Sequence, residues 1–229
     1  MIFDGKKFAE EIIAKLPRKK AKLAIFLDPE NMSGAKYVQK KIELAKRLGV
    51  EIVMNKVDGS EDGIMVQLPH PDAENLIAKI SPEKDVDGLR EDSLYQPAVV
   101  RAVCVILGHS LKDYPFWSKR IILVGAKGFV GRRLMRGLPN AIGMDKDDFD
   151  PSALLRADVV ISATGQAGII KPEMVKEEVI AIDVGYPRGD FDPEVAQKAS
   201  FFTPVPGGVG PVTVAMLFAN LLESVNNVR

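Results

Sequence analysis

The chain has 229 residues, of which 46% are hydrophobic and 27% are charged, and its 31 basic residues balance 31 acidic ones. Such a length can bury a substantial core in one large or two small domains, and the composition is that of an ordinary globular protein. The neutral balance lacks the basic footprint of a nucleic-acid binder, and no apolar run approaches the roughly 18 residues that a membrane span requires. We therefore expect neither a nucleic-acid partner nor a membrane partner.

The cysteine and histidine content limits the possible disulfides and metal sites and indicates the cellular compartment. Cys104 is the only cysteine, so an internal disulfide is excluded, and two histidines with one cysteine argue against a structural zinc site. The residues that follow Asp4 lack the apolar stretch of a signal peptide. We expect a cytoplasmic protein that binds no metal.

Helix-like and strand-like segments alternate along the first half of the chain. A long helix is predicted to end at Gly49, because glycine readily takes the left-handed conformation that terminates helices. Asp72 is predicted to cap a shorter helix. The expected strands are 22–27, 50–54 and 62–67, and the expected helices are 34–48, 73–79 and 98–108.

The alternation becomes more regular from residue 120 onward. The expected strands are 120–124, 140–144, 158–162 and 179–183, with helical segments between them. Strands that alternate with helices predict a parallel sheet that is covered on both faces. We predict an α/β fold of two domains, the second a Rossmann-like dinucleotide-binding domain with a parallel sheet, and a cleft between them.

A glycine-rich loop follows the first of these later strands. Its glycines are spaced GxxGxxG, which differs from the GxGxxG of the common dinucleotide-binding fingerprint. The mechanism is the same, because a tight turn lets the backbone approach a pyrophosphate at a helix N-terminus. Ligands also gather at the carboxyl ends of parallel strands, such as the end of strand 158–162. The residues expected to contact a dinucleotide are Gly125, Ala126, Lys127, Gly128, Gly131, Asp145, Thr164 and Gly165.

A second unusual loop, residues 203–211, contains three glycines and three prolines. Such a loop is rigid, lets the backbone approach a ligand closely, and leads into a helix for which Pro211 suits the first position. A helix N-terminus favours polar or anionic ligand atoms. The alternative is an ordinary tight turn before a helix.

Polar groups that could perform chemistry lie in the first half of the chain. Tyr37 and Lys41 are four residues apart and share a helix face, where the ring could stack on a flat substrate and the ammonium deliver a proton. We expect Lys41 on an exposed face, and the alternative is an ordinary surface Tyr–Lys pair. Gln67 ends an otherwise apolar strand, which suggests that it faces a cleft. Residues 85–88 are either an Asx-type turn or an acceptor for two N–H donors.

Four motifs, in order along nearly the whole chain, resemble those of the bifunctional methylenetetrahydrofolate dehydrogenase/methenyltetrahydrofolate cyclohydrolases. Residues 37–41 resemble the family's Tyr-Val-x-x-Lys helix, and residues 62–71 resemble its Asp-Gly-Ile-Leu-Val-Gln-Leu-Pro-Leu-Pro signature. Residues 84–88 match Lys-Asp-Val-Asp-Gly, and residues 203–211 match Thr-Pro-Val-Pro-Gly-Gly-Val-Gly-Pro without change.

The resemblance implies an enzyme that oxidises 5,10-methylenetetrahydrofolate with NADP or NAD and hydrolyses the methenyl product to 10-formyltetrahydrofolate. It implies that Lys41 is the catalytic lysine of the cyclohydrolase step, with Gln67 hydrogen-bonded beside it. Tyr37 would stack against the pterin, and Asp87 would accept two N–H bonds from the pterin edge. The remaining substrate-binding residues that the resemblance implies are Gly207, Gly208 and Pro211, near the nicotinamide.

The family architecture also implies how the chain is divided. Residues 1–100 and 212–229 would form the folate-binding catalytic domain, with the last helix packed back on it. Residues 101–211 would form the NAD(P)-binding domain. The family further implies a homodimer.

The chain departs from the family pattern at three places. A short loop before Asp62 stands where the family has a helix, and residues 96–99 replace the family's Pro-Cys-Thr-Pro. Ala126 replaces an arginine of the family's glycine-rich loop. Because Asp145 could bind ribose hydroxyls and repel a 2′-phosphate, we expect NAD+ to be preferred over NADP+. The opposing positive charges nearby are Lys127, Arg132, Arg133 and Lys146.

Two other functions are compatible with these departures. One is a dehydrogenase whose cyclohydrolase activity is weak or lost. The other is a non-catalytic relic that still binds folate or nucleotide. The retention of Tyr37 and Lys41 argues against the relic, because folding would need neither residue.

Overall fold

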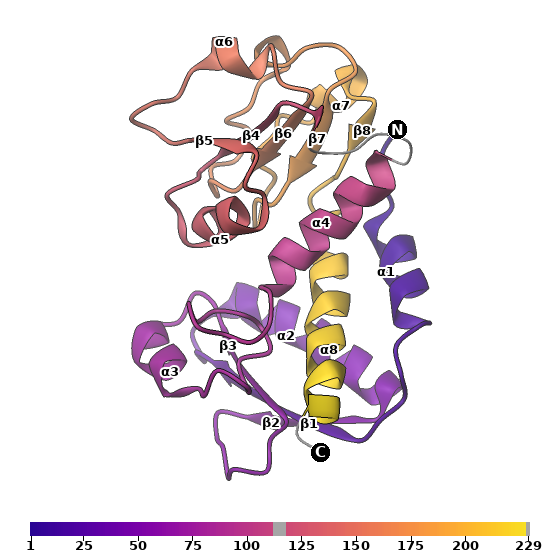
Figure 1. Ribbon diagram of the computed structural model, residues 1–229, viewed down its shortest axis with the longest axis vertical. Coiled ribbons are helices and arrows are strands. Elements are labelled where there is room, and N and C mark those ends of the chain that lie inside the picture. The colour runs from indigo at the N-terminus through magenta and orange to yellow at the C-terminus, as the bar shows by residue number, and fades with distance from the viewer. Residues whose placement is uncertain (112–117, 228–229) are drawn as a thin grey trace. The chain divides into compact units, whose positions relative to one another are not determined.

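The computed structural model describes residues 1–111 and 118–227, and the chain divides into two compact units (Figure 1). Unit 1 comprises Met1–Glu10 and Val99–Thr213, and unit 2 comprises Glu11–Ala98 and Val214–Arg229. The first ten residues, which the sequence analysis assigned to the folate-binding domain, therefore group with the other unit. Helix α8, Val209–Asn227, begins in unit 1 and continues in unit 2.

Within the described residues, unit 1 is built around a five-stranded sheet in the order β5-β4-β6-β7-β8, and every neighbouring pair is parallel. Strands β4, β6 and β7 are buried at every position, as expected where helices cover both faces of a sheet. The sequence analysis missed β8, which is only two residues long. The strands are β4 Ile121–Val124, β5 Ala141–Met144, β6 Val159–Ser162, β7 Ile180–Asp183 and β8 Phe201–Phe202.

The helices of unit 1 connect these strands and complete its core. The sheet's apolar side chains pack with residues from the connecting segments, among them Leu154, Ile170 and Val195, all 0% exposed. The helical segments are α4 Ala98–Ser110, whose first residue groups with unit 2, then α5 Phe129–Gly137, α6 Pro151–Leu154, the 3₁₀ turn Pro172–Met174 and α7 Val195–Lys198.

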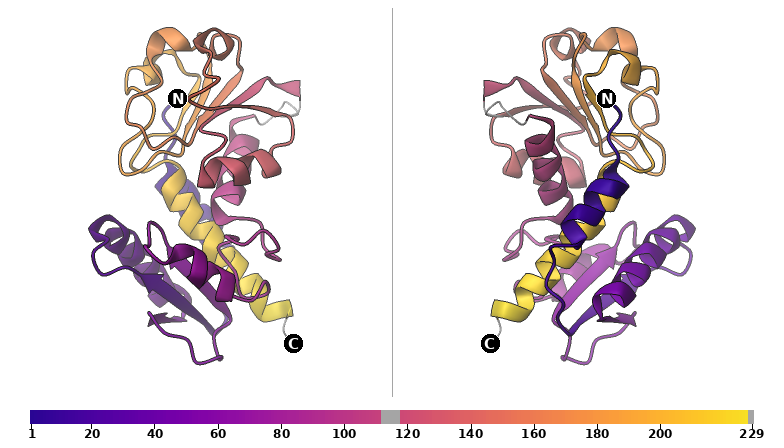
Figure 2. Two further views of the ribbon diagram at one scale, coloured as in Figure 1. Left: turned by 90° about the vertical axis from the view of Figure 1, so that its left-hand side faces the viewer. Right: turned by 90° about the vertical axis from the view of Figure 1, so that its right-hand side faces the viewer.

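In the described part of unit 2, three parallel strands form a sheet in the order β2-β1-β3. Helices α2 and α8 lie on opposite sides of this sheet (Figure 2). The strands are β1 Ala21–Leu27, β2 Val50–Met54 and β3 Gly63–Gln67, and the helices are α2 Met32–Leu48 and α3 Ala73–Lys79, with α1 Gly5–Ile13 crossing the division between the units.

The ends of α2 and α3 show how local chemistry sets helix boundaries. Helix α2 begins two residues before the predicted start, because the Asn31 side chain accepts a hydrogen bond from the backbone N–H of Gly34 at 2.7 Å. It ends at Gly49 in the left-handed conformation, as predicted. The predicted cap of α3 was wrong in its chemistry: Asp72 stands at the N-cap position without a capping bond and accepts from the Asn75 amide instead.

Helix α8 is attached to unit 2 by polar side chains that donate hydrogen bonds to one buried and two partly buried carbonyl groups. The Asn220 amide donates to Val86 O at 2.7 Å and to Gln96 O at 3.0 Å, and Ser224 Oγ donates to Asp62 O at 3.0 Å. Because buried carbonyls without donors would cost free energy, these bonds fix the position of the helix on this unit. Pro211 is the third residue of α8 rather than the first, a position where its missing N–H still has no helical partner to lose.

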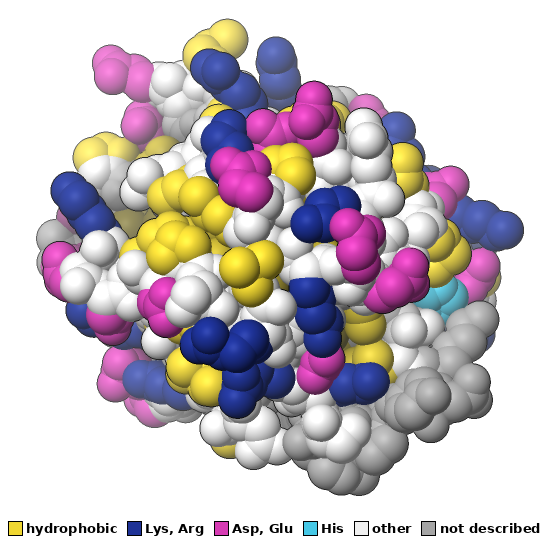
Figure 3. Space-filling view, turned by 90° about the horizontal axis from the view of Figure 1, so that it is seen from above, with side chains coloured by type: hydrophobic (Ala, Val, Ile, Leu, Met, Phe, Trp, Pro, Cys, Tyr) yellow, Lys and Arg dark blue, Asp and Glu magenta, His cyan; other side chains and the backbone are white. Residues whose placement is uncertain are grey.

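The molecular surface mixes charges of both signs. On the face drawn in Figure 3, Lys and Arg side chains lie beside Asp and Glu side chains, with small hydrophobic areas between them. Pairs such as Lys176 with Asp158, at 2.6 Å, belong to this pattern. Among the described helices, none is long and apolar enough to cross a membrane.

Gly131 and Gly108 give a matched test of the glycine-rich loop. A Cβ on Gly131 would lie 1.9 Å from the carbonyl oxygen of Gly125, whereas a Cβ on Gly108, in α4, would meet nothing within 4 Å. We expect Gly131→Ala to lower the free energy of unfolding by about 1–3 kcal/mol, because backbone must shift to admit the methyl group. Gly108→Ala should raise it by roughly 0.5–1 kcal/mol, since alanine is favoured within helices. Thermal unfolding of both variants checks this, and equal effects would contradict it.

Candidate functional site

The first candidate site, in unit 2, is centred on Lys41 of α2. The sequence analysis expected this lysine on an exposed helix face, and the structure corrects that, because Lys41 is only 5% exposed. Its ammonium donates a hydrogen bond of 2.6 Å to Gln67 Oε1 at the end of β3. Gln67 Nε2 donates to Leu68 O at 3.0 Å, which directs the amide oxygen toward the lysine. The predicted contact between Lys41 and Gln67 is therefore present.

Burial changes the proton affinity of Lys41. Removal from water lowers the pKa of Lys41 from 10.5 to about 8, while the negative charge of Asp87 opposes this shift. A group with a pKa near the working pH is well suited to give and regain a proton. Lys41 is thus prepared for acid–base chemistry by its surroundings in unit 2.

Tyr37 lies one helical turn before Lys41 and provides an aromatic face. The Lys41 ammonium is 5.3 Å from the ring centroid of Tyr37, and the Lys40 ammonium is 5.7 Å from it. Both distances lie within the range of a cation–π attraction. The ring is half-buried, so Tyr37 combines a flat apolar surface with a neighbouring proton donor.

The loop after α3 holds two aspartates with different tasks. Asp85 is fully buried, and its carboxylate accepts hydrogen bonds from the backbone N–H groups of Leu89 and Arg90 at 3.1 and 2.7 Å. Asp85 therefore shapes the turn. Asp87, two residues later, is half-buried, and its charge acts on Lys41. The two interpretations of residues 85–88 therefore concern different residues. Asp85 makes the hydrogen bonds of the turn, and Asp87 is the carboxylate whose charge acts on Lys41.

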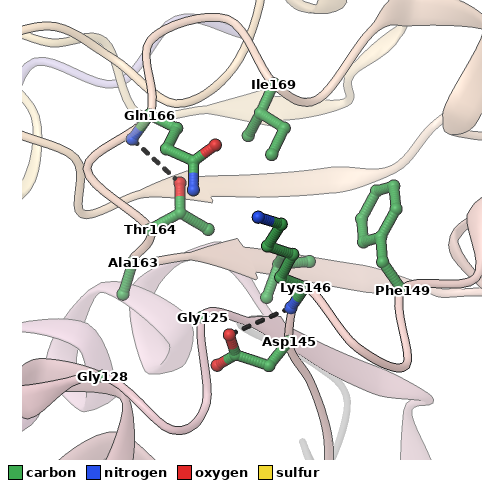
Figure 4. Close-up of a pocket in the computed structure, with 10 residues that line it drawn as sticks. Gly125, Gly128, Asp145, Lys146, Phe149, Ala163, Thr164, Gln166 and Ile169 are labelled. Carbon is green, nitrogen blue, oxygen red and sulfur yellow. Dashed lines mark hydrogen bonds between the residues drawn. The ribbon is translucent and has the colours of Figure 1, made fainter.

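The second candidate site is a pocket of about 410 Å³ in unit 1, at the carboxyl ends of β4, β5 and β6. In Figure 4, side chains from these strand ends and from the following loops surround the pocket, with Phe149 and Ile169 supplying apolar surface. Such a position is where parallel α/β sheets bind their ligands. The lining residues are Val124, Gly125, Gly128, Asp145, Lys146, Phe149, Ala163, Thr164, Gln166 and Ile169.

The glycine-rich loop lines the pocket with backbone atoms that no side chain covers, at Gly125 and Gly128. Gly125 has a φ of +86°, which disfavours other residues, and the close approach of Gly131 to its carbonyl leaves no room for a side chain. Gly128 stands at the N-cap of α5 without a side-chain cap. The backbone N–H groups at this helix start therefore suit an anionic ligand group.

Asp145 borders the pocket but also organises the loop. One carboxylate oxygen accepts from the backbone N–H of Lys127 at 2.8 Å, and the other accepts from the backbone N–H of Lys146 at 3.0 Å. These bonds lower the pKa of Asp145, so its negative charge is retained at the pocket. The Lys146 side chain also lines the pocket, which places a positive charge beside this carboxylate (Figure 4).

The predicted cofactor residues fall into two groups. Gly125, Gly128, Asp145 and Thr164 line the pocket, whereas Ala126, Lys127, Gly131 and Gly165 are not among its lining residues. Sequence reasoning missed the apolar lining, because Phe149 and Ile169 lie in loops without a periodic pattern. The lining residues that it did not include are Val124, Phe149, Ala163, Gln166 and Ile169, and it considered Lys146 only as a nearby positive charge.

The proline- and glycine-rich loop has a structural explanation within unit 1. Gly208 is buried and its N–H donates to Pro204 O at 2.7 Å. Gly5 packs so closely on this loop that a Cβ there would lie 1.9 Å from Gly208 O and 2.5 Å from Gly207 O. Gly207, Gly208 and Pro211 do not line the pocket of unit 1, so a substrate contact by them stays a prediction.

Comparison with known proteins identifies relatives over the whole chain. Residues 97–229 match the family model described as tetrahydrofolate dehydrogenase/cyclohydrolase, NAD(P)-binding domain. Bifunctional protein FolD 1 of Geobacter metallireducens is 32% identical, over 99% of this chain and 98% of that protein. Bifunctional protein FolD of Mycoplasmopsis synoviae is 32% identical, over 97% of this chain and 98% of that protein.

Solved structures show the same likeness. The bifunctional FolD enzyme from Campylobacter jejuni is 29% identical, with a TM-score of 0.86 over 100% of this chain and 99% of that one. The methylenetetrahydrofolate dehydrogenase-cyclohydrolase of Trypanosoma brucei, solved with NADP and an inhibitor, is 26% identical. Its TM-score is 0.87 over 100% of this chain and 98% of that one.

The lowered pKa of Lys41 predicts a pH-dependent stability. Between pH 8 and pH 10.5 the folded chain holds fewer protons at Lys41 than the unfolded chain, so rising pH favours folding across this window. Relative to Lys41→Met, the wild-type free energy of unfolding should therefore rise by about 2–3 kcal/mol between pH 7 and pH 10. Urea unfolding at both pH values measures it. Lys40→Met, which removes an exposed lysine, should show no such difference from wild type. A constant difference between wild type and Lys41→Met would contradict the burial argument.

Proposed function

The chain belongs to the tetrahydrofolate dehydrogenase/cyclohydrolase family, and from this premise we propose that it carries out both reactions of the bifunctional enzyme. It oxidises 5,10-methylenetetrahydrofolate to 5,10-methenyltetrahydrofolate with NAD(P)+, and it hydrolyses the methenyl compound to 10-formyltetrahydrofolate. The observation that carries the proposal is the hydrogen bond from the buried ammonium of Lys41 to Gln67, with the Tyr37 ring beside it.

In the cyclohydrolase step, water attacks the methenyl carbon and a C–N bond then breaks. Lys41 moves the proton that these events require, because its pKa of about 8 lets it exchange protons near neutral pH. Gln67 holds the Lys41 ammonium in place through its amide oxygen. Tyr37 supplies the surface on which the pterin ring stacks.

Asp87 recognises the edge of the pterin in this proposal. The aminopyrimidinone edge presents two N–H donors in a fork, and a carboxylate accepts such a pair with both oxygens. The half-buried position of Asp87, together with its electrostatic contact with Lys41, supports a place beside the reacting group. Asp85 is the carboxylate that holds the turn, through the backbone N–H groups of Leu89 and Arg90.

The pocket of unit 1 fits a nicotinamide dinucleotide. Its volume of about 410 Å³ is suited to part of such a cofactor, and Gly125 and Gly128 lie where a pyrophosphate meets a helix start. Phe149 and Ile169 offer apolar faces to a flat ring. The bound cofactor supplies the hydride chemistry, and the protein supplies binding and orientation.

Two statements about the intact protein complete the proposal. We expect a homodimer, as the family resemblance implies, and a cytoplasmic location, as the single cysteine suggests. Light scattering of the purified protein measures the first, and a monomeric mass would contradict it. Fractionation of the source cells measures the second.

One assay separates the proposed function from its alternatives. Methenyltetrahydrofolate absorbs light, so its formation from methylenetetrahydrofolate with NAD+ or NADP+ and its later decay report the two reactions in turn. We expect formation followed by decay faster than the uncatalysed rate. Formation without faster decay would favour a dehydrogenase alone, and the absence of both would favour the binding relic.

Replacement of Lys41 tests the catalytic assignment. Lys41→Met keeps an unbranched side chain, one heavy atom shorter, and removes the proton-carrying group, so we expect cyclohydrolase activity to fall about 10²–10⁴-fold. Lys40→Met is the matched control, because Lys40 also lies over Tyr37 but is exposed. Hydrolysis of methenyltetrahydrofolate by each variant measures the effect. Near-wild-type hydrolysis by Lys41→Met would remove the lysine from the mechanism.

Asp87→Ala tests recognition of the pterin. Loss of a charge-assisted hydrogen bond costs about 1.5–3 kcal/mol, so folate affinity should fall roughly ten- to a hundred-fold while dinucleotide affinity is unchanged. Asp72→Ala, at an exposed aspartate without a capping bond, is the control. Separate calorimetric titrations with tetrahydrofolate and with NAD+ measure the two affinities. An unchanged folate affinity would reduce Asp87 to a structural residue of its turn.

The charge beside the pocket predicts a cofactor preference. Asp145 keeps its negative charge at the pocket and would repel a 2′-phosphate, so we expect kcat/KM to be roughly tenfold higher with NAD+ than with NADP+. Lys146 is the opposing group, and Lys146→Met should lower the use of NADP+ further. Steady-state rates with saturating methylenetetrahydrofolate measure this. Equal values, or a preference for NADP+, would show that Lys146 outweighs Asp145.

A further inference from the structure

Unit 1 contains a pair of buried carboxylates that the proposed reactions do not use. Asp183 ends strand β7 and is 1% exposed, and Asp190 is 0% exposed in the loop that follows. Burial raises the pKa of Asp183 to about 6, and the negative charge of Asp190 contributes to this rise as a smaller cause. Two carboxylates kept out of water at such proximity are costly, so their placement calls for an explanation.

Asp183 organises the loop that carries Asp190. Its Oδ1 accepts from the backbone N–H of Gly185 at 2.9 Å and from that of Asp190 at 3.0 Å, and its Oδ2 accepts from the N–H of Phe191 at 3.1 Å. These three bonds fold the loop back on the end of β7. The Asp190 side chain is thereby held in one position rather than left to sample several.

Asp190 in turn forms hydrogen bonds with the end of β6 and with the segment that follows it. Its Oδ2 accepts from Ser162 Oγ at 2.8 Å, from the backbone N–H of Thr164 at 2.6 Å and from that of Gly165 at 3.3 Å. Thr164 lines the pocket, and its Oγ1 accepts from the N–H of Gln166, another lining residue (Figure 4). A single oxygen of Asp190 thus fixes one wall of the pocket from behind.

The same loop is also bonded to the pocket wall through its backbone. The N–H of Ile170 donates to Asp190 O at 3.0 Å, and the N–H of Gly168 donates to Gly189 O at 3.0 Å. These backbone bonds would persist if the Asp190 side chain were changed. A substitution of the Asp190 side chain therefore removes its hydrogen bonds to Thr164 and Gly165, while the backbone hydrogen bonds of the loop remain.

The second oxygen of Asp190 argues against a role in stability alone. Asp190 Oδ1 is buried and has no hydrogen-bond partner among residues 1–111 and 118–227. A buried carboxylate oxygen without a donor costs free energy, and an amide or an apolar group would avoid that cost. Oδ2, by contrast, accepts three hydrogen bonds, from Ser162 at the end of β6 and from Thr164 and Gly165 in the segment that follows.

We propose that Asp190 is a positioning residue for the dinucleotide pocket, which acts by holding the Thr164–Gly165 backbone in the conformation that the cofactor binds. This inference rests on the proposed function, because it takes the ligand of the pocket to be a nicotinamide dinucleotide. Asp190 does not touch the reacting atoms. Its effect appears in dinucleotide affinity rather than in the cyclohydrolase step, which uses no dinucleotide.

The test compares Asp190→Ala with Asp190→Asn. Alanine leaves the three donors without an acceptor, whereas asparagine can keep an oxygen at the place of Oδ2. We expect Asp190→Ala to raise the Kd and KM for NAD+ about 10- to 100-fold, with kcat restored at saturating NAD+ and cyclohydrolase activity unchanged. Asp190→Asn should recover most of the affinity. Asp192→Ala, which removes a partly exposed ion pair with Lys171, is the control and should leave the KM unchanged.

The possible results divide clearly. Wild-type NAD+ affinity in Asp190→Ala would overturn the inference, and so would an equal loss of dehydrogenase and cyclohydrolase activity in both Asp190 variants, which would mark a purely structural residue. If Asp190→Ala fails to fold, Asp190→Ser decides, because the shorter serine side chain cannot place an oxygen where Oδ2 meets the N–H groups of Thr164 and Gly165. An unchanged KM for NAD+ in Asp190→Ser would overturn the inference. Failure of the wild type to bind either NAD+ or NADP+ would instead refute the proposed function of the pocket.

Discussion

The burial of one ammonium group is the constraint on which the candidate site of unit 2 depends. Lys41 lies on a helix that covers the β2-β1-β3 sheet, and its charged end meets the end of β3. Placing a charge there costs free energy, which the Gln67 amide and the Tyr37 ring only partly offset. The remaining cost appears as the lowered pKa of Lys41, and that same shift gives the lysine its chemical usefulness.

Buried carboxylates play a complementary part in both units. Asp85 in unit 2 and Asp190 in unit 1 each accept backbone N–H bonds and so impose a particular loop conformation. In each case a neighbouring residue with greater exposure is the one that we propose meets the ligand, Asp87 in unit 2 and Thr164 in unit 1. Under this proposal, one carboxylate in each unit shapes the backbone and a different residue contacts the ligand.

The sequence predicted most of the strands, because parallel strands buried on both faces are continuous apolar runs, as in Ile121–Val124 and Val159–Ser162. It could not predict β8, which has only two residues and exists because Phe201 and Phe202 pair with Ile180 and Ala181. The position of Gln67 at a strand end did signal a polar site. The burial of Lys41 carried no such signal, because helix periodicity alone does not reveal how deeply β3 and the loop with Asp87 enclose the lysine.

The dinucleotide pocket shows the same limit. The glycine spacing predicted the part of the pocket that the glycine-rich loop forms, because the tight turn at Gly125 and the close approach of Gly131 depend on local sequence. Phe149 and Ile169 reach the pocket from irregular loops, whose course is set by long-range contacts such as the bond from the N–H of Ile170 to Asp190 O. Such contacts join residues that are distant in the chain and leave no pattern in it.

The most direct test of the account is the pKa of Lys41 itself. Nitrogen NMR of the lysine side chains, followed across a pH titration and assigned by comparison with Lys41→Met, measures it in the folded protein. The account predicts a value of about 8, below that of the exposed lysines. A value near the ordinary 10.5 would contradict it, because the ammonium would then be solvated and the Lys41–Gln67 site would not exist as described.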